Sequence, residues 1–329
     1  PIYGLYAALI PQVMYAIFGS SRQVAIGPVA MDSLIVAAGV SAIHLVGSES
    51  YIAAAILLAL VVGAIQFLMG AFRLGFIVNF LSRPVISGFT SAAALIIGFN
   101  QFRNLFGVDF VRSNQIQDVI QDVWIHISEL NVNTTIIGIT SIIVILVLKS
   151  INKKIPNALI VVVLGIIIVK YLGNGLADVA IIKEIPSGLP SFSIPEIDIA
   201  EVKELMPIAL TLVMVGFLET ISIGKSLESK QDEYRIRPNQ ELIALGISNM
   251  VGSLFKAYPS TSSFSRSAIN QESGGTTGMA ALVSVGMVII TLLFLTPIFY
   301  YLPKAVLAAI IIVAVFGLVN VKEAIHLWK

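Results

Sequence analysis

The chain has 329 residues, of which 57% are hydrophobic and 12% are charged, and its formal net charge is +1. A soluble globular domain carries about 25% charged residues, so this chain has too few charges to cover a water-soluble globule of its size. Much of its surface is therefore expected to face lipid, and its near-zero net charge offers no basic surface for nucleic acid.

The composition also excludes several kinds of reactive centre. The chain contains no cysteine, which rules out disulfides, thiolate metal sites and cysteine nucleophiles. Its three histidines, His44, His126 and His326, lie far apart and show no metal-ligand spacing. We find no nucleophile–base pair in the pattern of residues, so we expect no cofactor, no metal and no enzymatic activity.

Apolar runs recur along the whole chain, beginning with residues 1–18. A membrane-spanning helix needs about 20 mainly apolar residues. The later runs of roughly this character are Tyr51–Gly70, Pro84–Phe102, Val132–Leu148, Ile155–Val169, Leu205–Leu218, Asn239–Phe255, Thr276–Pro303 and Ala305–Val321. They are continuously apolar and do not alternate, which predicts membrane helices rather than barrel strands. Together with two interrupted stretches they make about eleven membrane elements.

Two longer connections separate these runs. Asn104–Asn131 carries apolar residues at helical spacing, which predicts an amphipathic helix on the membrane surface or packed on the protein. Gly173–Lys203 is rich in proline and glycine and is expected to be an irregular loop between two repeats. Gly63 and Gly70, two turns apart, predict close packing of their helix against a neighbour.

The first interrupted stretch starts near Ser21. Gln23–Ile26 is predicted to be extended, and Gly27-Pro28 then breaks the chain. Proline suits the first turn of a helix, so a new helix should begin there and run only to about Ser41. A helix of this length is too short to span the membrane and is expected to begin part-way across it.

The second interrupted stretch has the same layout in the second half of the chain. Tyr258-Pro259 precedes a short polar extended piece, and Ser262 or Ser263 can cap the helix that carries Arg266. Paired short segments in two halves are typical of an inverted-repeat transporter and its substrate site. Two helix N-termini that meet there, with an arginine beside them, favour a small anion.

Three charged residues inside the apolar regions are candidates for function: Asp32, Glu219 and Arg266. Arg266 could instead pair with a carboxylate in an ordinary bundle of kinked helices. Glu219 follows an apolar run and could take up a proton that offsets the charge of a bound anion, or it could lie at the inner interface near Lys225. For Asp32, a cation site, a pairing with Arg266 and a purely structural role all stay open.

Several motifs resemble the sulfate permease family of anion transporters, which includes the solute-carrier-26 type. They are residues 1–6 (PIYGLY), 18–23 (FGSSRQ), 27–30 (GPVA), 239–242 (NQEL), 264–268 (FSRSA), 274–276 (GGT) and 302–307 (LPKAVL). The resemblance implies an all-α integral membrane fold of two inverted repeats of seven segments, with two discontinuous half-helices, short β pieces, and a core and a gate domain. By this mapping the chain holds segments 2 to 12 and lacks segment 1, segments 13–14 and the cytoplasmic STAS domain, as expected for a piece of a longer polypeptide. The first repeat would cover residues 1–172, the outer linker 173–203 and the second repeat 204–329 of a single transmembrane domain.

The resemblance also implies where the anion binds. The matching positions lie at the starts of the two half-helices and are Val29, Ala30, Phe264, Ser265 and Arg266. Glu219 matches the family's acidic position that is linked to proton or sodium coupling. Asp32 and Ser267 are further candidates, to which the resemblance assigns no role.

We therefore predict a secondary transporter of small inorganic anions, sulfate foremost, with proton or sodium symport by an elevator-type movement. The alternatives are a bicarbonate or dicarboxylate transporter or an anion exchanger of the same family, a nucleobase carrier of the same fold, and an anion channel. The resemblance further implies a homodimer of the full-length protein, and we expect its lipid bilayer to be the bacterial inner membrane.

Overall fold

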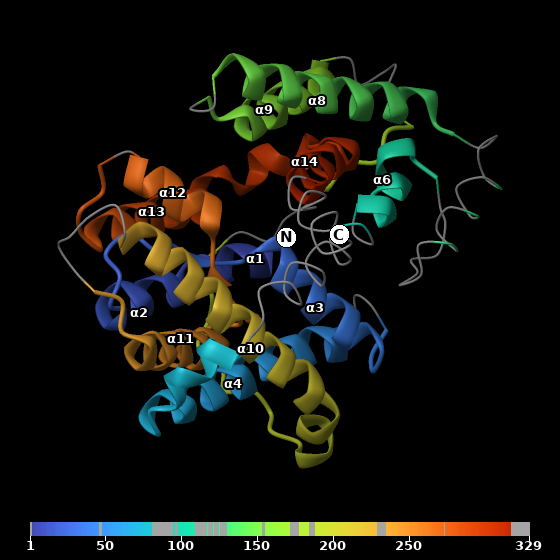
Figure 1. Cartoon of the computed structure of the whole chain (residues 1–329). Coiled ribbons are helices and arrows are strands. Elements are labelled where there is room, and N and C mark those ends of the chain that lie inside the picture. The colour runs from blue at the N-terminus through green and yellow to red at the C-terminus, as the bar shows by residue number, and fades with distance from the viewer. Residues whose placement is uncertain are drawn as a thin grey trace, which may run out of the picture. The chain divides into compact units, whose positions relative to one another are not determined.

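The computed structural model describes residues 2–45, 48–80, 95, 98–108, 117, 121, 125, 130–152, 155–171, 178–183, 188–228, 235–272 and 274–316. Helices make up most of these residues (Figure 1). The chain divides into two compact units, each assembled from separate stretches of sequence. Unit 1 comprises Pro1–Ser82 and Ser187–Phe294, and unit 2 comprises Arg83–Pro186 and Leu295–Lys329.

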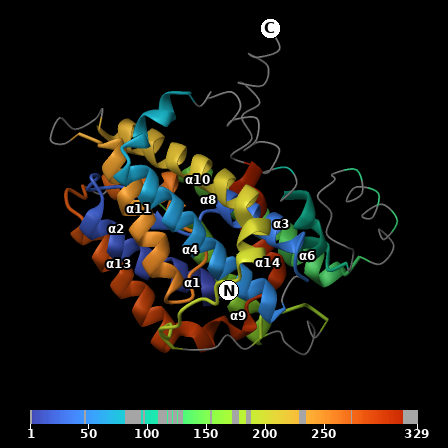
Figure 2. The ribbon, with the colours of Figure 1, turned by 90° about the horizontal axis from the view of Figure 1, so that it is seen from below.

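Unit 1 contains both interrupted stretches. Its elements are α1 (Ile2–Ala7), α2 (Ile10–Phe18), β1 (Ile26–Gly27), α3 (Ala30–Ser41), α4 (Glu49–Ala71), the 3-10 helix η1 (Leu74–Phe80), α10 (Ile199–Glu228), α11 (Pro238–Ser253), β2 (Thr261–Ser262), α12 (Phe264–Glu272) and α13 (Met279–Ile290). Its core is formed chiefly by α3, α4 and α10, whose apolar side chains pack together. Figure 2 shows α4, α10 and α11 running side by side.

Glycines allow α4 and α11 to approach each other closely. A Cβ atom at Gly63 would lie 2.6 Å from the backbone nitrogen of Met250, and one at Gly246 would lie 2.5 Å from that of Phe67. At Gly70 it would lie 2.7 Å from Ile243. Since real Cβ atoms do not come this near to a backbone, the predicted role of Gly63 and Gly70 in helix packing is confirmed.

The first apolar run is broken into α1 and α2 at residues 8–9. Pro11 lies in the first turn of α2, where its missing N–H and fixed φ are tolerated but where it prevents continuation from the preceding turn. A single helix over residues 1–18 therefore does not form.

Unit 2 contains α6 (Phe102–Phe106), α8 (Val132–Ile151), α9 (Asn157–Tyr171), the 3-10 helix η5 (Thr296–Tyr301) and α14 (Lys304–Phe316). Its core clusters apolar residues of α8, α9 and α14. The π-helical turn η4 (Thr291–Leu295) connects α13 to η5 and contains the boundary between the units. Large apolar side chains on α8 and α9, such as Ile136, Ile143 and Leu159, are exposed, which suits a lipid solvent.

Most predicted runs are observed as helices with similar bounds, and α4, α8, α9 and α11 confirm theirs. The predicted run Leu205–Leu218 is shorter than the observed helix, since α10 spans 30 residues and includes Pro207. Its polar ends stay helical beyond the apolar centre, so part of the predicted loop 173–203 is also helix. The run Thr276–Pro303 is helical but changes from α to π to 3-10 geometry. Most of the predicted elements 84–102 and 104–131, and the end of 305–321, lie outside the described residues.

Four of the described helices are long and apolar enough to cross a membrane: α4, α8, α10 and the continuous helix Met279–Tyr301. The predicted helical membrane architecture is confirmed at this level.

Candidate functional site

The two interrupted stretches pair with each other as β-strands. β1 and β2 are antiparallel, with Ile26 opposite Ser262 and Gly27 opposite Thr261. Each strand leads directly into a short helix, β1 into α3 and β2 into α12. The structure thus brings together two segments separated by more than half of the chain, as the sequence predicts.

The starts of both half-helices lie beside this strand pair. α3 begins at Ala30 and is preceded by Val29 in an extended conformation, which provides no side-chain cap. Ser263 precedes α12, and its hydroxyl accepts a hydrogen bond from the Arg266 backbone N–H at 3.4 Å. The predicted serine cap is therefore Ser263. A helix start without a full set of caps keeps N–H groups available for an anion.

Ser267 fastens the two stretches together. Its hydroxyl accepts a hydrogen bond from the Ala25 backbone N–H at 2.9 Å and donates one to the Ser263 carbonyl at 2.6 Å. The Ser263 N–H in turn donates to the Ala25 carbonyl at 2.9 Å. Because Ser267 is buried and its hydroxyl is engaged on both sides, this predicted candidate has a structural contact rather than a free donor.

Arg266 lies over the start of α3. Its Nη2 donates to the Pro28 carbonyl at 3.2 Å, and a Cβ atom at Gly27 would lie only 2.9 Å from Nη1. Within the described residues the one contact between a basic and an acidic side chain is His44 with Glu201, so no carboxylate there pairs with the guanidinium. A pairing of Arg266 with Asp32 or with another bundle carboxylate is therefore not observed among these residues.

Asp32 lies in the first turn of α3 and is fully buried. Its Oδ2 accepts a short hydrogen bond from the Thr261 hydroxyl on β2. A second short contact joins Ser262 to Thr220 of α10, and the Thr220 hydroxyl donates to the Gly216 carbonyl at 2.8 Å. These hydroxyls connect α3, β2 and α10 into one polar network inside unit 1.

Glu219 of α10 joins the same network. Glu219 lies one turn after Gly216 of α10, and the Thr261 side chain packs against that glycine. One of its oxygens, Oε2, is buried. The residue therefore lies against the half-helices and not on an open surface of the unit.

The predicted substrate residues are only partly described. Val29 is partly buried, and Phe264 is 65% exposed and directed away from the packed interior. The side chains of Ala30 and Ser265 fall outside the described set. The binding roles of Val29, Ala30, Phe264, Ser265 and Arg266 therefore stay predictions.

Sequence reasoning missed Thr261 and Thr220, and it considered Ser262 only as a helix cap. Thr261 and Ser262 were placed in the polar extended piece, but nothing in their spacing indicates a contact with α10 or α3. A helpful signal is Gly216, which lies one turn before Thr220: the Thr261 side chain packs against this glycine, where a larger residue would displace it.

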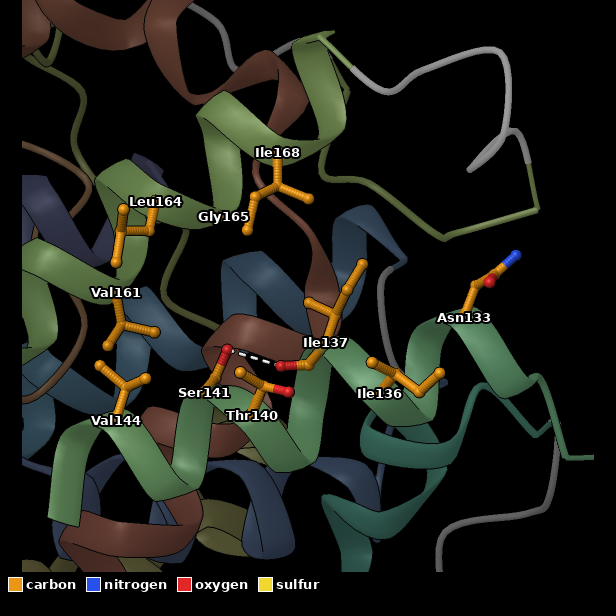
Figure 3. A pocket seen from close by; sticks show the side chains of 10 residues that line it. All are labelled: Asn133, Ile136, Ile137, Thr140, Ser141, Val144, Val161, Leu164, Gly165 and Ile168. Carbon is orange, nitrogen blue, oxygen red and sulfur yellow. Dashed lines mark hydrogen bonds between the residues drawn. The ribbon is translucent and has the colours of Figure 1, made fainter. Parts of the chain in front are cut away.

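A separate cavity of about 410 Å³ lies between α8 and α9 of unit 2 (Figure 3). Its lining is mainly aliphatic, with Asn133, Thr140 and Ser141 as the polar exceptions, and it includes no charged side chain. The Ser141 hydroxyl is already used in a 2.7 Å bond to the Ile137 carbonyl. Because it has no cation and no free helix start, this cavity is a poor site for an anion.

Comparisons with known proteins agree with this architecture. The chain is 41% identical to the Arabidopsis thaliana protein named Sulfate transporter 4.1, chloroplastic, and the alignment covers 100% of this chain and 49% of that protein. It is 36% identical to the Bos taurus Sodium-independent sulfate anion transporter, over 100% of this chain and 59% of the relative. The chain thus spans about half the length of the curated relatives it matches.

Solved structures show the same fold. The murine Solute Carrier 26 family member A9 anion transporter, in its inward-facing state, superposes with a TM-score of 0.90 at 26% identity, covering 100% of this chain and 58% of that one. The transmembrane domain of a cyanobacterium bicarbonate transporter, BicA, gives a TM-score of 0.87 at 23% identity, covering 99% of this chain and 85% of that one. The second likeness concerns the fold alone.

The sequence matches the sulfate permease family over residues 1–329. This family consists of membrane transporters, which agrees with the expectation of a transporter rather than an intramembrane enzyme. On the full-length match and on its helical membrane fold, the chain is an integral membrane protein of the sulfate permease family.

Proposed function

We propose that the intact protein is a secondary transporter of small inorganic anions and that sulfate is its main substrate. The observation that carries the proposal is Arg266, which lies at the paired starts of α3 and α12 with no carboxylate partner among the described residues. A permanent cation beside two helix N-termini is suited to a small oxyanion. The names of the relatives at 41% and 36% identity support sulfate over other anions.

We further propose that Glu219 couples transport to protons. It is a carboxylate beside the strand pair, with one buried oxygen, and protonation would offset the charge of the bound anion. The name of the bovine relative describes transport independent of sodium, which favours a proton over a sodium ion. The division into two compact units supports an elevator-type movement of one unit against the other.

The site assignment is tested by uptake of labelled sulfate into liposomes that contain the intact protein. Arg266→Ala should reduce uptake at least tenfold, since about 1.4 kcal/mol of lost binding or transition-state energy corresponds to a factor of ten. Arg235→Ala is the matched control, because Arg235 is exposed and lies outside the helices. Uptake that Arg266→Ala leaves unchanged would remove the site from consideration.

The same liposomes test substrate and coupling. Sulfate should compete with itself more strongly than bicarbonate, a dicarboxylate or uracil, and competition by uracil alone would favour a nucleobase carrier. Uptake should follow an inward proton gradient and should lose that dependence in Glu219→Gln. Currents at the single-channel level would instead indicate an anion channel.

The assembly and the location are proposals of the same kind. We propose a homodimer, to be tested by mass measurement in lipid nanodiscs, and residence in the bacterial inner membrane, to be tested by fractionation. A monomeric mass, or recovery from another membrane, would contradict the respective proposal.

A further inference from the structure

Two carboxylates in unit 1 each keep one buried oxygen without a hydrogen-bond donor. They are Asp32 Oδ1 on α3 and Glu219 Oε2 on α10, and neither has a partner within the described residues. An ionised oxygen in this position loses its hydration and gains nothing in return. A pair of such groups therefore needs either a bound cation or a proton.

Thr261 stands between these carboxylates. It is almost completely buried, its hydroxyl donates to Asp32 Oδ2, and its side chain packs on α10 at Gly216, one turn before Glu219. A threonine hydroxyl has one proton to donate and can accept in return. It can therefore satisfy two ionised carboxylates only one at a time, whereas a protonated Glu219 can donate to Thr261 while Thr261 donates to Asp32.

The surrounding charges favour the same arrangement. The neighbouring titratable groups are Tyr258, whose hydroxyl lies 3.2 Å from the Ser33 hydroxyl of α3, and Arg266 on α12, which donates to the Pro28 carbonyl. Tyr51 of α4 is a further titratable side chain near Tyr258. No cation among the described residues pairs with Asp32 or Glu219, so two ionised carboxylates would leave uncompensated negative charge inside the unit, and a proton on one of them reduces that charge.

Among the described residues, one further buried acid lies apart from this pair. Glu241 on α11, a helix that packs on α10, accepts hydrogen bonds from Tyr15 at 2.7 Å and from the backbone N–H and hydroxyl of Ser20 at 2.8 and 2.5 Å. η1, which also packs on α10, contributes no titratable side chain.

We propose that Asp32, Thr261 and Glu219 form a carboxylate pair that shares one proton through the Thr261 hydroxyl and takes up a second proton with the anion. At rest the Glu219 carboxyl donates to Thr261 Oγ1, and the Thr261 O–H donates to ionised Asp32. When the anion binds, a proton from the water adds to Asp32 Oδ1, and both carboxyls are neutral. The same proton returns to water when the anion leaves, so every proton is accounted for. This inference rests on the proposed function and refines it: the pair carries the coupling, with Glu219 holding the shared proton and Asp32 taking up the proton that moves with the anion.

The experiment measures sulfate accumulation driven by a proton gradient, and sulfate counterflow at equal pH, in liposomes with the intact protein. Asp32→Asn should lower gradient-driven accumulation at least 5-fold, the lower end of typical coupling between two ligands, and should retain counterflow. The double variant Asp32→Asn/Glu219→Gln should accumulate no less sulfate than the single variant with the lower accumulation, because the two groups act as a unit. Glu196→Gln, in an exposed loop, is the control.

Thr261 provides an independent test that does not alter charge. Thr261→Val keeps the shape but removes the hydroxyl and should lower accumulation as Asp32→Asn does, whereas Thr261→Ser keeps the hydroxyl and should restore it. If the thermal unfolding of Asp32→Asn shows that this variant does not fold, the comparison of Thr261→Val with Thr261→Ser tests the shared proton by itself.

The outcomes separate this inference from the proposed function. Normal proton-driven accumulation in Asp32→Asn, or equal loss in Thr261→Ser and Thr261→Val, overturns the shared proton and leaves the roles of Arg266 and Glu219 intact. Accumulation driven by sodium at equal pH overturns it in favour of a cation bound by the pair. Full transport in both Arg266→Ala and Glu219→Gln would remove the proposed function itself.

Discussion

At the scale of single residues, buried hydroxyls hold the candidate site together. Ser267, Thr261 and Ser262 each connect segments that are remote in the sequence. A buried side chain that both accepts and donates hydrogen bonds is costly to replace, because its partners cannot form hydrogen bonds with water instead. The positions of the charged residues at the candidate site thus depend on these uncharged hydroxyl side chains.

Ser267→Ala tests this dependence. The change leaves the Ala25 backbone N–H without its acceptor, so we expect the intact protein to lose about 1–3 kcal/mol of stability. Ser41→Ala, which removes only an exposed bond to the Ala38 carbonyl, should be nearly neutral. Thermal unfolding in detergent gives the measurement, and equal melting temperatures of the two variants would contradict the expectation.

A pH-dependent contact lies outside the membrane helices, at Asp178. The side-chain amides of Asn133 and Asn131 donate to its carboxylate and hold its pKa below the ordinary value. The unfolded chain then binds a proton more readily than the folded one. The contribution to stability is therefore complete above the ordinary aspartate pKa of about 3.9 and is lost as the pH falls through the lower folded value.

Asn133→Ala should raise the pKa of Asp178 toward its ordinary value, because one donor to the ionised form is removed. Asn157→Ala, which affects only the first turn of α9, is the comparison. The titration of the Asp178 carboxyl carbon by NMR gives the answer, and an identical pKa in Asn133→Ala and the unaltered protein would refute it.

At the scale of elements, the close crossing of α4 and α11 gives unit 1 its framework. Neither helix has room for a side chain where their backbones approach each other, at Gly63 and Gly246. In lipid, packing of this kind replaces the hydrophobic effect as a source of helix association. The framework supports α10, which carries Glu219 and packs against α4 and α11.

Gly246→Ala should destabilise the intact protein by about 1–3 kcal/mol, since the added methyl group would collide with the backbone at Phe67. Gly286→Ala on α13 is a matched control: a Cβ there meets nothing within 4 Å, and alanine is the better helix former. A Gly246→Ala variant as stable as Gly286→Ala would show that the helices can move apart at little cost.

The elements also show which features were predictable from sequence. The break at Gly27-Pro28 marks the start of α3, and both its existence and its end at Ser41 were predicted correctly. The ends of α10 were not, because polar residues can continue a helix beyond the apolar run that identifies it. The contact of Thr261 with Asp32 could not be predicted from the sequence, since it joins residues 229 positions apart that no local pattern links.

At the scale of the whole molecule, the solvent is lipid and the surface reflects it. α8 exposes Ile136, Ile139 and Ile143 along its length. In water such a face would bind a partner or aggregate, but in a bilayer it is the ordinary exterior. The predicted repeat bounds at 1–172 and 204–329 stay a prediction, although both compact units draw on both of these regions.

Ile143→Lys should impair membrane insertion, although Ile143 is an exposed position that would tolerate lysine in a soluble protein. A lysine near the centre of a membrane helix costs about 2.5–3.5 kcal/mol. Ile151→Lys, at the exposed end of the same helix, should cost much less, because its side chain can extend toward the headgroups. The fraction of each variant recovered in the membrane compares them, and equal recovery would contradict a membrane-embedded α8.

The pairing of β1 with β2 has a consequence for biosynthesis. Ile26 cannot meet Ser262 until 236 further residues have left the ribosome. At about 5–20 residues per second, that delay is roughly 12 to 47 seconds. During this interval Asp32 has no Thr261 to bond and the start of α3 has no neighbouring strand, so the first interrupted stretch waits without the contacts that it has in the folded unit. The strand pair in unit 1 consequently forms only after α4, α10 and α11 have been synthesised.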